Sequence, residues 1–309
     1  MKVPSGSQDW RRRLWRRVIR YDAVSRCSRL LRPWLTRAGT DLQTGEEVAI
    51  KLTYIADGPE ILRWEKHMYD ELAGGAGIPR VRFYGSECDF YVLVHDLLGP
   101  SLEDLFNYCG RRFSLKTILL IADQAIFRIE HIHAKGIIHR DIKPDHFLMG
   151  LGKHGNTLYA IDFGLARCFA DSHKDVEGLP FGGTRLFASI RNHGGCVQSW
   201  GDDLESLGYV LLYFARGSLP WQHLEISGNK ADDKQIKAMK ESFSGEALYH
   251  DDLPSPFATY MDYVRSLDFG EKPDYAYLWG LSRRLFTAEG FKYDKVFDWT
   301  EKRFHEICS

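Results

Sequence analysis

The sequence predicts an α+β protein of two lobes, a small β-rich lobe followed by a larger helical lobe. Between residues 41 and 96 the pattern is that of strands, interrupted by one helical stretch. After Gly99 apolar residues recur at steps of three and four, which is the period of a helix. A chain of 309 residues is long enough for two such lobes, and a cleft is expected where they join, near residues 96–100.

The small lobe is expected to contain three strands and a helix. The segment TGEEVAIKLTYI at 44–55 begins with a turn and continues as a strand. Residues 58–75 favour a helix, because Pro59 suits a first turn and the pair Gly74–Gly75 suits its exit. Residues 81–99 favour two strands around a short connection.

The large lobe is expected to begin with a helix of about 20 residues that ends near Gly136, because an apolar stripe runs along it. A stripe of this kind is typical of a core-facing helix and not of a ligand site. Four further segments also favour helices: 202–216, 231–243, 255–267 and 275–286.

Residues 1–40 differ in composition from the rest of the chain. The first 37 residues hold ten arginines and three tryptophans, against only Asp9 and Asp22. Such a segment can bind nucleic acid or act as a nuclear import signal, or it can be a loosely packed extension, which is the favoured interpretation. We therefore predict an atypical arginine-rich segment at 1–40 and one domain at 41–303, with lobes at about 41–96 and about 100–303.

Composition excludes several classes of protein. The formal net charge is −1, so nucleic acid is not an expected partner of the whole chain. No apolar run approaches the roughly 20 residues of a membrane span, and the N-terminus lacks the apolar stretch of a signal peptide. An intracellular protein of the cytoplasm or nucleus is expected, with its six cysteines, none in a C-x-x-C pair, as free thiols.

Charged residues occur in the order that phosphoryl transfer requires, a reaction that needs charge neutralisation and placement of the nucleophile. Lys51, at the end of VAIK, is expected to neutralise the α- and β-phosphates of ATP, with Glu65 as its acidic partner. Asp141 and Lys143, in HRDIKP, are expected to orient a substrate hydroxyl and to steady the γ-phosphate. Asp162, in DFG, is expected to chelate Mg²⁺. Together these motifs predict a two-lobed protein-kinase fold.

Two parts of this apparatus are missing. No G-x-G-x-x-G loop lies upstream of Lys51, where backbone amides would close over the phosphates, so the first strands are expected to be atypical. His146 occupies the last position of H-R-D-x-x-x-x-N, where an asparagine would bind the metal. Imidazole suits transition ions better than Mg²⁺, so Mn²⁺ is the expected preference if His146 is a ligand.

From about residue 41 to 301 the sequence resembles the casein kinase I family of serine/threonine protein kinases. The segments that carry the resemblance are LLGPSLEDLFN (97–107), FSLKT (113–117), HFLMGLGK (146–153), GTRLFASI (183–190), DDLESLGYV (202–210), GSLPWQ (217–222), FATY (257–260), KPDYAYL (272–278) and VFDW (296–299).

The resemblance implies ATP as cofactor and protein substrates. It implies that Asp96 and Leu98 offer backbone groups to the adenine and that Ala49 and Leu148 sandwich its ring. It also implies that Asp203 supports the backbone of the HRD loop.

The sequence departs from the family at several functional positions. The arginine-rich segment replaces the Gly-rich loop, and His146 replaces the metal-binding asparagine. Trp200 and Gly201 stand where family members carry arginines that help to bind acidic or phosphorylated substrates. His95 stands where a larger apolar side chain usually closes the back of the ATP pocket.

We therefore expect an ATP-dependent serine/threonine protein kinase of impaired or unusual activity. The alternative is a pseudokinase that binds or scaffolds partners. A third interpretation is a damaged product, in which residues 1–40 come from an altered reading of an exon that should encode the Gly-rich loop.

Overall fold

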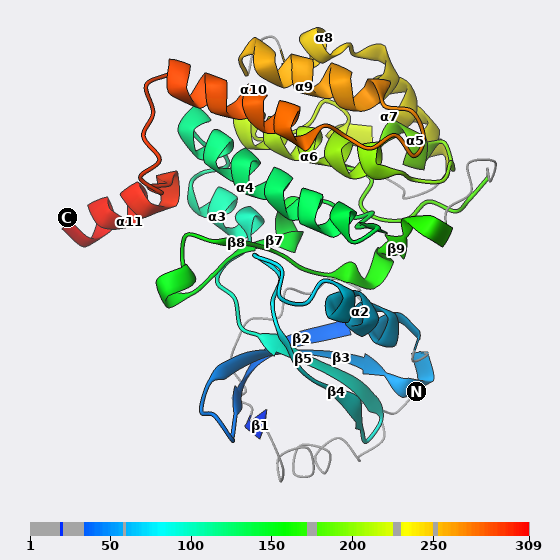
Figure 1. The fold of residues 1–309 in the computed structure, drawn as a ribbon, viewed down its shortest axis with the longest axis vertical. Helices are drawn as coiled ribbons and strands as arrows, with labels where there is room; N and C mark the ends of the chain where they lie inside the picture. The colour runs from blue at the N-terminus through cyan, green and yellow to red at the C-terminus, as the bar shows by residue number, and fades with distance from the viewer. Residues whose placement is uncertain are drawn as a thin grey trace. The chain divides into compact units, whose positions relative to one another are not determined.

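The computed structural model describes residues 19–20, 34–57, 60–171, 178–224, 230–249 and 253–308. The chain divides into two compact units, Met1–Gly99 and Pro100–Ser309 (Figure 1). No helix within the described ranges is long and apolar enough to cross a membrane. No two of the five cysteines that the structure describes form a disulfide with each other, and Cys27 lies outside the described residues.

The first unit is built on a five-stranded antiparallel sheet with the strand order β1-β2-β3-β5-β4. Its strands are β1 (Ile19–Arg20), β2 (Trp34–Asp41), β3 (Glu47–Tyr54), β4 (Val81–Glu87) and β5 (Phe90–Asp96). A turn links β2 to β3, where Asp41 Oδ1 accepts from the Gln43 amide at 2.8 Å and Gly45 adopts a φ of 73°. Glycine tolerates this left-handed conformation without a steric penalty.

Strand β3 is the centre of this sheet, and six consecutive residues of it, 48–53, are buried. A strand that is covered on both faces needs no alternation, which explains the continuous run VAIKLT. Helix α2 (Glu60–Glu71) contacts β4 and β5 and buries Leu62 and Met68. The sheet's apolar core consists of Val48, Ile50, Leu52, Val92 and Val94.

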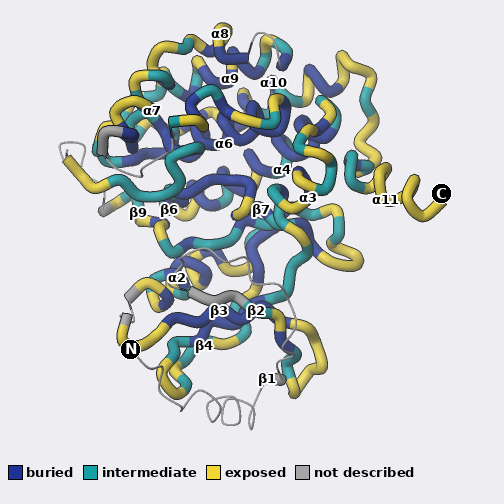
Figure 2. The backbone as a smooth tube through the Cα atoms, turned by 180° about the vertical axis from the view of Figure 1, so that it is seen from behind, coloured by how far each residue is buried: buried dark blue, intermediate teal, exposed yellow. Residues whose placement is uncertain are grey.

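The second unit is mainly helical. Its helices are α3 (Leu102–Tyr108), α4 (Leu115–Ala134), α5 (Ile190–His193), α6 (Trp200–Arg216), α7 (Lys230–Ser242), α8 (Gly245–Tyr249), α9 (Ser255–Ser266), α10 (Tyr275–Ala288) and α11 (Asp298–Cys308). Helix α6 is buried almost throughout and contacts α4 and α9 (Figure 2). A helix that is buried on all sides lies at the centre of a fold, and α6 is the core of this unit.

Two short strand pairs frame the loops that carry the motifs. Strands β6 (Ile137–Ile138) and β9 (Arg167–Cys168) pair with each other, as do β7 (Phe147–Met149) and β8 (Leu158–Ala160). The HRD segment leaves β6 and enters β7, and the DFG segment lies between β8 and β9. The pairings therefore bring the two motifs together within one unit.

The long elements agree with the sequence patterns. The helix of about 20 residues predicted from an apolar stripe is α4, which spans 20 residues. The helix predicted at 58–75 is shorter, since α2 ends at Glu71. Strand β2 crosses the expected boundary at residue 40, because it begins at Trp34 within the arginine-rich segment. Most of that segment, to which nucleic-acid binding and nuclear import had been assigned as alternatives, lies outside the described residues.

Candidate active site

In the first unit, Lys51 of β3 and Glu65 of α2 form a buried ion pair. Lys51 Nζ donates to Glu65 Oε2 at 2.6 Å, and the two residues are only 5% and 1% exposed. A buried charge is costly unless it is paired, so this arrangement fixes the position of the ammonium group. An ammonium held in this way can neutralise a phosphate.

The residues expected to meet adenine from the first unit lie at the end of β5 and beside it. Ala49 is buried, and Leu98 is half-buried. The Asp96 carboxylate accepts from Arg82 Nε at 2.7 Å. The His95 ring reaches the Asp96 carbonyl at 2.9 Å, and because a carbonyl only accepts, Nδ1 must be the donor. One of the backbone groups that Asp96 is expected to offer to the adenine, its carbonyl, thus already accepts a hydrogen bond.

In the second unit, Asp203 of α6 holds the backbone of the HRD loop. Its Oδ2 accepts from the His139 amide at 2.7 Å and its Oδ1 from the Arg140 amide at 2.8 Å. Arg140 adopts a φ of 70°, which is unfavourable for a side chain of this size. The two hydrogen bonds to one buried carboxylate stabilise this strained turn, as the resemblance implied for Asp203.

Two further residues, His133 and Tyr275, orient the Asp203 carboxylate. His133 Nε2 lies 2.9 Å from Asp203 Oδ2, and His133 Nδ1 contacts the hydroxyl of Tyr275. Burial alone would raise the pKa of Asp203, but the hydrogen bond and charge of His133, with His139, lower it below its ordinary value. Asp203 is therefore ionised, and Nε2 of His133 carries the hydrogen that it donates to the Asp203 carboxylate.

Asp141 lies in a cluster of three hydrogen-bonded side chains. Lys143 Nζ donates to Asp141 Oδ2 at 2.7 Å and to Thr184 Oγ1 at 2.9 Å, and Thr184 Oγ1 donates to Asp141 Oδ1 at 2.8 Å. Burial acts to raise the pKa of Asp141, but the neighbouring His146 and Lys143 and the bond from Thr184 lower it. An ionised carboxylate in a fixed orientation can accept the hydrogen bond of a substrate hydroxyl.

His139 links the HRD loop to the DFG segment. The Asp141 amide donates to His139 Nδ1 at 3.3 Å, and His139 Nε2 lies 3.1 Å from the Ile161 carbonyl. The amide only donates and the carbonyl only accepts, so Nε2 carries the proton and the ring is neutral. Complete burial lowers the pKa of His139, which agrees with this assignment.

His146 lies between Asp141 and Asp162. Its Nδ1 is 3.0 Å from the Asp141 carbonyl, which only accepts, so Nδ1 is the donor. Its Nε2 is 3.3 Å from Asp162 Oδ2, yet this buried atom has no hydrogen-bond partner among the described residues. His146 Nε2 and Asp162 Oδ2 therefore face each other, and each atom could donate an electron pair to a metal ion.

These two side chains fit a divalent metal only in part. No group of three or more histidine, cysteine or acidic side chains among the described residues could hold a metal by itself. Magnesium commonly takes one or two carboxylates and completes its shell with phosphate oxygens and water. Asp162 suits that role, and the unpartnered Nε2 of His146 adds a nitrogen ligand that suits transition ions better than Mg²⁺.

The family model described as Protein kinase domain matches residues 37–265, which is more than half of the chain. The chain belongs to the protein kinase domain family. Membership implies kinase chemistry in general, with ATP, a divalent metal and protein substrates. The two-lobed α+β architecture expected from the sequence is confirmed, with a small antiparallel sheet unit and a helical unit.

The sequence reasoning did not identify three residues that support the kinase cluster. Thr184 was read only as part of a family-like segment, although it contacts both Asp141 and Lys143. His133 and Tyr275 were assigned no role, although His133 contacts Asp203 and Tyr275 contacts His133.

Leu148, which was expected beside the adenine, lies in β7, where it forms a bridge to Ser101.

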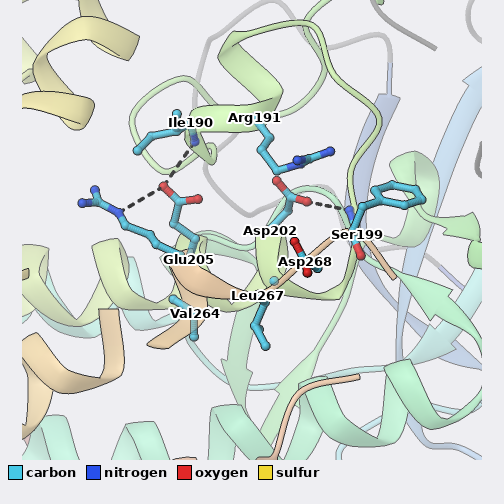
Figure 3. A pocket seen from close by; sticks show the side chains of 11 residues that line it. Ile190, Arg191, Ser199, Asp202, Glu205, Val264, Leu267 and Asp268 are labelled. Atoms are coloured by element: carbon cyan, nitrogen blue, oxygen red, sulfur yellow. Dashed lines mark hydrogen bonds and ion pairs between the residues drawn. The ribbon is translucent and has the colours of Figure 1, made fainter. Parts of the chain in front are cut away.

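A cavity of about 140 Å³ lies outside this cluster, at the N-terminal end of α6 (Figure 3). Asp202 turns toward the Ser199 amide, and Glu205 reaches the Ile190 amide at 3.2 Å. Complete burial raises the pKa of Asp202 from 3.8 to about 7, although hydrogen bonds from Ser189 and Ser199 act in the opposite direction. Asp202 and Asp203 are thus adjacent buried aspartates with opposite pKa shifts.

Replacing Asp202 with asparagine is expected to change how the stability of the kinase domain depends on pH. A carboxyl whose pKa is raised by folding stabilises the fold below pH 3.8, and this contribution is lost as the pH rises through about 7. The free energy of unfolding of the variant should therefore rise, relative to the wild type, by about 3 kcal/mol between pH 4.5 and pH 8. Denaturant unfolding at both pH values measures this difference. The control is Asp268→Asn, at an exposed carboxylate of the same cavity, and parallel curves for wild type and Asp202→Asn would contradict the expectation.

Proposed function

We propose that this protein is a serine/threonine protein kinase resembling casein kinase I, with activity reduced by the missing Gly-rich loop and by His146. The observation that supports this most strongly is the hydrogen bonding of Asp141. Its carboxylate accepts from Lys143 and Thr184 and stands on a loop whose backbone Asp203 holds, and the neighbouring His146 and Lys143 lower its pKa. A chain that had lost catalysis would have no chemical need for this arrangement.

The roles of the residues follow from their chemistry. Asp141 accepts the hydrogen bond of a serine or threonine hydroxyl, and Lys143 steadies the γ-phosphate of ATP. Lys51, held by Glu65, neutralises the α- and β-phosphates. Ala49 and Leu148 sandwich the adenine, and the backbones of Asp96 and Leu98 receive its polar edge.

The proposal includes a metal preference. When bound, a divalent ion would neutralise the charge that develops on the phosphates. Asp162 and Nε2 of His146 would hold it from the protein. Because one of these donors is an imidazole nitrogen, we infer that Mn²⁺ supports activity better than Mg²⁺.

The test is transfer of radiolabelled γ-phosphate from ATP to casein by the purified protein, with Mg²⁺ and with Mn²⁺. Transfer that depends on Asp141 and is larger with Mn²⁺ would support the proposal. Label that persists in an Asp141→Asn variant would indicate a contaminating kinase. No transfer with either metal, from protein that unfolds cooperatively, would reject the enzymatic function.

A second function, that of a pseudokinase, is favoured by one observation. His146 Nε2 already lies 3.3 Å from Oδ2 of Asp162, the carboxylate expected to hold the metal. A side chain this close to the carboxylate would leave less room for the ion, and the protein would then bind partners without catalysis. Absence of transfer, together with no shift of the unfolding temperature on addition of ATP and either metal, would select this function.

Replacing His146 with asparagine is expected to abolish the preference for Mn²⁺. The amide oxygen is a hard ligand that suits Mg²⁺, so Mg²⁺-supported turnover should rise by about 10²-fold. The activity ratio of Mn²⁺ to Mg²⁺ should fall toward one. Steady-state kinetics with each metal measure this, and His154→Asn, at an exposed histidine outside the cluster, is the control.

A spectroscopic readout makes the metal prediction independent of activity. Pulsed electron paramagnetic resonance of Mn²⁺ bound with ATP should show a ¹⁴N coupling from the imidazole of His146. The coupling should persist in His154→Asn and disappear in His146→Asn. A spectrum of the wild type without nitrogen coupling would exclude His146 as a ligand.

A further inference from the structure

The segment 181–188 runs beside Asp141. Thr184 bonds to Asp141 and Lys143, and a Cβ on Gly183, whose φ is 99°, would stand 3.3 Å from Asp141 Oδ1. If Asp141 orients the acceptor hydroxyl, the substrate residues next to that hydroxyl must pass over this segment. The charge that the segment presents therefore bears on which substrates are accepted.

Arg185, the residue after Thr184, is the cation of this segment, and Asp233 of α7 already binds it. Arg185 Nε donates to Asp233 Oδ1 at 2.7 Å and Arg185 Nη2 to Asp233 Oδ2 at 3.3 Å. This is the two-point geometry with which arginine recognises a carboxylate. The guanidinium also lies over the ring of Phe181, 4.9 Å from its centroid. An acidic substrate group could bind Arg185 only by displacing Asp233.

Asp233 is not free to move aside. It is 7% exposed, and His193 Nδ1 lies 3.5 Å from its Oδ1. Lys240, on the same helix, is completely buried and donates to the carbonyls of Arg185 at 3.1 Å and Ala188 at 2.6 Å. Helix α7 is thus tied to the backbone of the segment whose arginine Asp233 neutralises.

We propose that Asp233 determines substrate preference by occupying Arg185 as an acidic substrate residue would. The inference rests on the proposed kinase function. The rest of the segment is uncharged, with Gly183 beside Asp141 and with Phe181, Gly182 and Leu186 half-buried. The preferred substrate is therefore a serine or threonine flanked by neutral or apolar residues, and an acidic neighbour gains nothing from Arg185.

The experiment measures peptide binding, so that it does not depend on catalysis. Labelled peptides carry alanine in place of the acceptor and either glutamate or leucine at the flanking positions, and their Kd values are measured by fluorescence anisotropy. Wild-type protein should bind the glutamate peptides no more tightly than the leucine peptides. Asp233→Asn should bind the glutamate peptides about tenfold more tightly than the wild type does, because Arg185 becomes available.

Two variants show whether Arg185 is responsible. Asp294→Asn removes a carboxylate that pairs with Lys116 at 2.9 Å on an exposed surface, and it should leave the preference unchanged. The double variant Arg185→Gln with Asp233→Asn should lose the gain. The double variant also distinguishes the contribution of Arg185 from that of Arg140. Arg140 is the second cation near the segment, because its Nη2 lies 3.7 Å from the position that a Cβ on Gly182 would take.

The outcomes separate this inference from the kinase proposal. Tighter binding of glutamate peptides by the wild type, or no gain in a folded Asp233→Asn variant, overturns the inference. Absence of measurable binding to either peptide by wild type and variant also overturns it. Failure to transfer phosphate to casein, with the peptide-binding pattern as expected, would reject only the kinase function.

Discussion

Replacing Asp141 with asparagine is expected to lower kcat for phosphate transfer by about 10²–10⁴-fold. In the proposed function this carboxylate accepts the hydrogen bond of the substrate hydroxyl, and its lowered pKa keeps it ionised at neutral pH. Asparagine keeps the shape and can still accept from Lys143, so the loop should remain in place. The KM for ATP should therefore change little, and steady-state kinetics with casein and ATP separate the two parameters.

A matched control for this variant is available four residues away. Asp145 is exposed, and Asp145→Asn makes the same change of charge without touching Lys143 or Thr184. Its kcat should stay within about threefold of the wild type, as is usual for surface changes. Equal losses in both variants would mean that charge near the loop matters, and that Asp141 has no special role.

Replacing Asp203 with asparagine is expected to lower the free energy of unfolding by about 3–5 kcal/mol, because it breaks a buried charge network. An amide has one oxygen, so its NH₂ group would face the backbone amide of His139 or Arg140, both of which need an acceptor. The pKa of Asp203 is lowered, so this carboxylate stabilises the fold above pH 3.8 and the contribution is lost on acidification. Denaturant unfolding at neutral pH measures the loss.

The same substitution should also impair catalysis. The strained backbone at Arg140, with a φ of 70°, is held by Asp203 and would relax, shifting Asp141. A displacement of about 1 Å can cost 10²-fold in kcat. At pH 8 the adjacent Asp202→Asn is the control, because that buried carboxyl has a raised pKa and its replacement should not destabilise the protein. Similar losses of stability in both variants at pH 8 would contradict this account.

The local features of the fold could be predicted from the sequence because they depend on near neighbours. The helical period of α4, the buried run of β3 and the hairpin of β4 and β5 each involve residues that lie close together in the sequence. The short strands β6 to β9 could not be predicted in this way. A strand of two or three residues is too short to show a period, and it forms because a distant partner supplies its hydrogen bonds.

In the candidate site, too, some features could be predicted from the sequence and others depend on tertiary packing. The sequence by itself determined the order of the motifs, and with it the identities of Lys51, Glu65, Asp141 and Asp162, because phosphoryl transfer needs those charges. Only the tertiary structure decided the partners that fix them. Thr184 meets Asp141 across 43 residues, and the Arg140 amide meets Asp203 across 63. Such pairs are set by the packing of α6 and its neighbouring loops, and no local sequence pattern records which buried polar groups the packing will bring together.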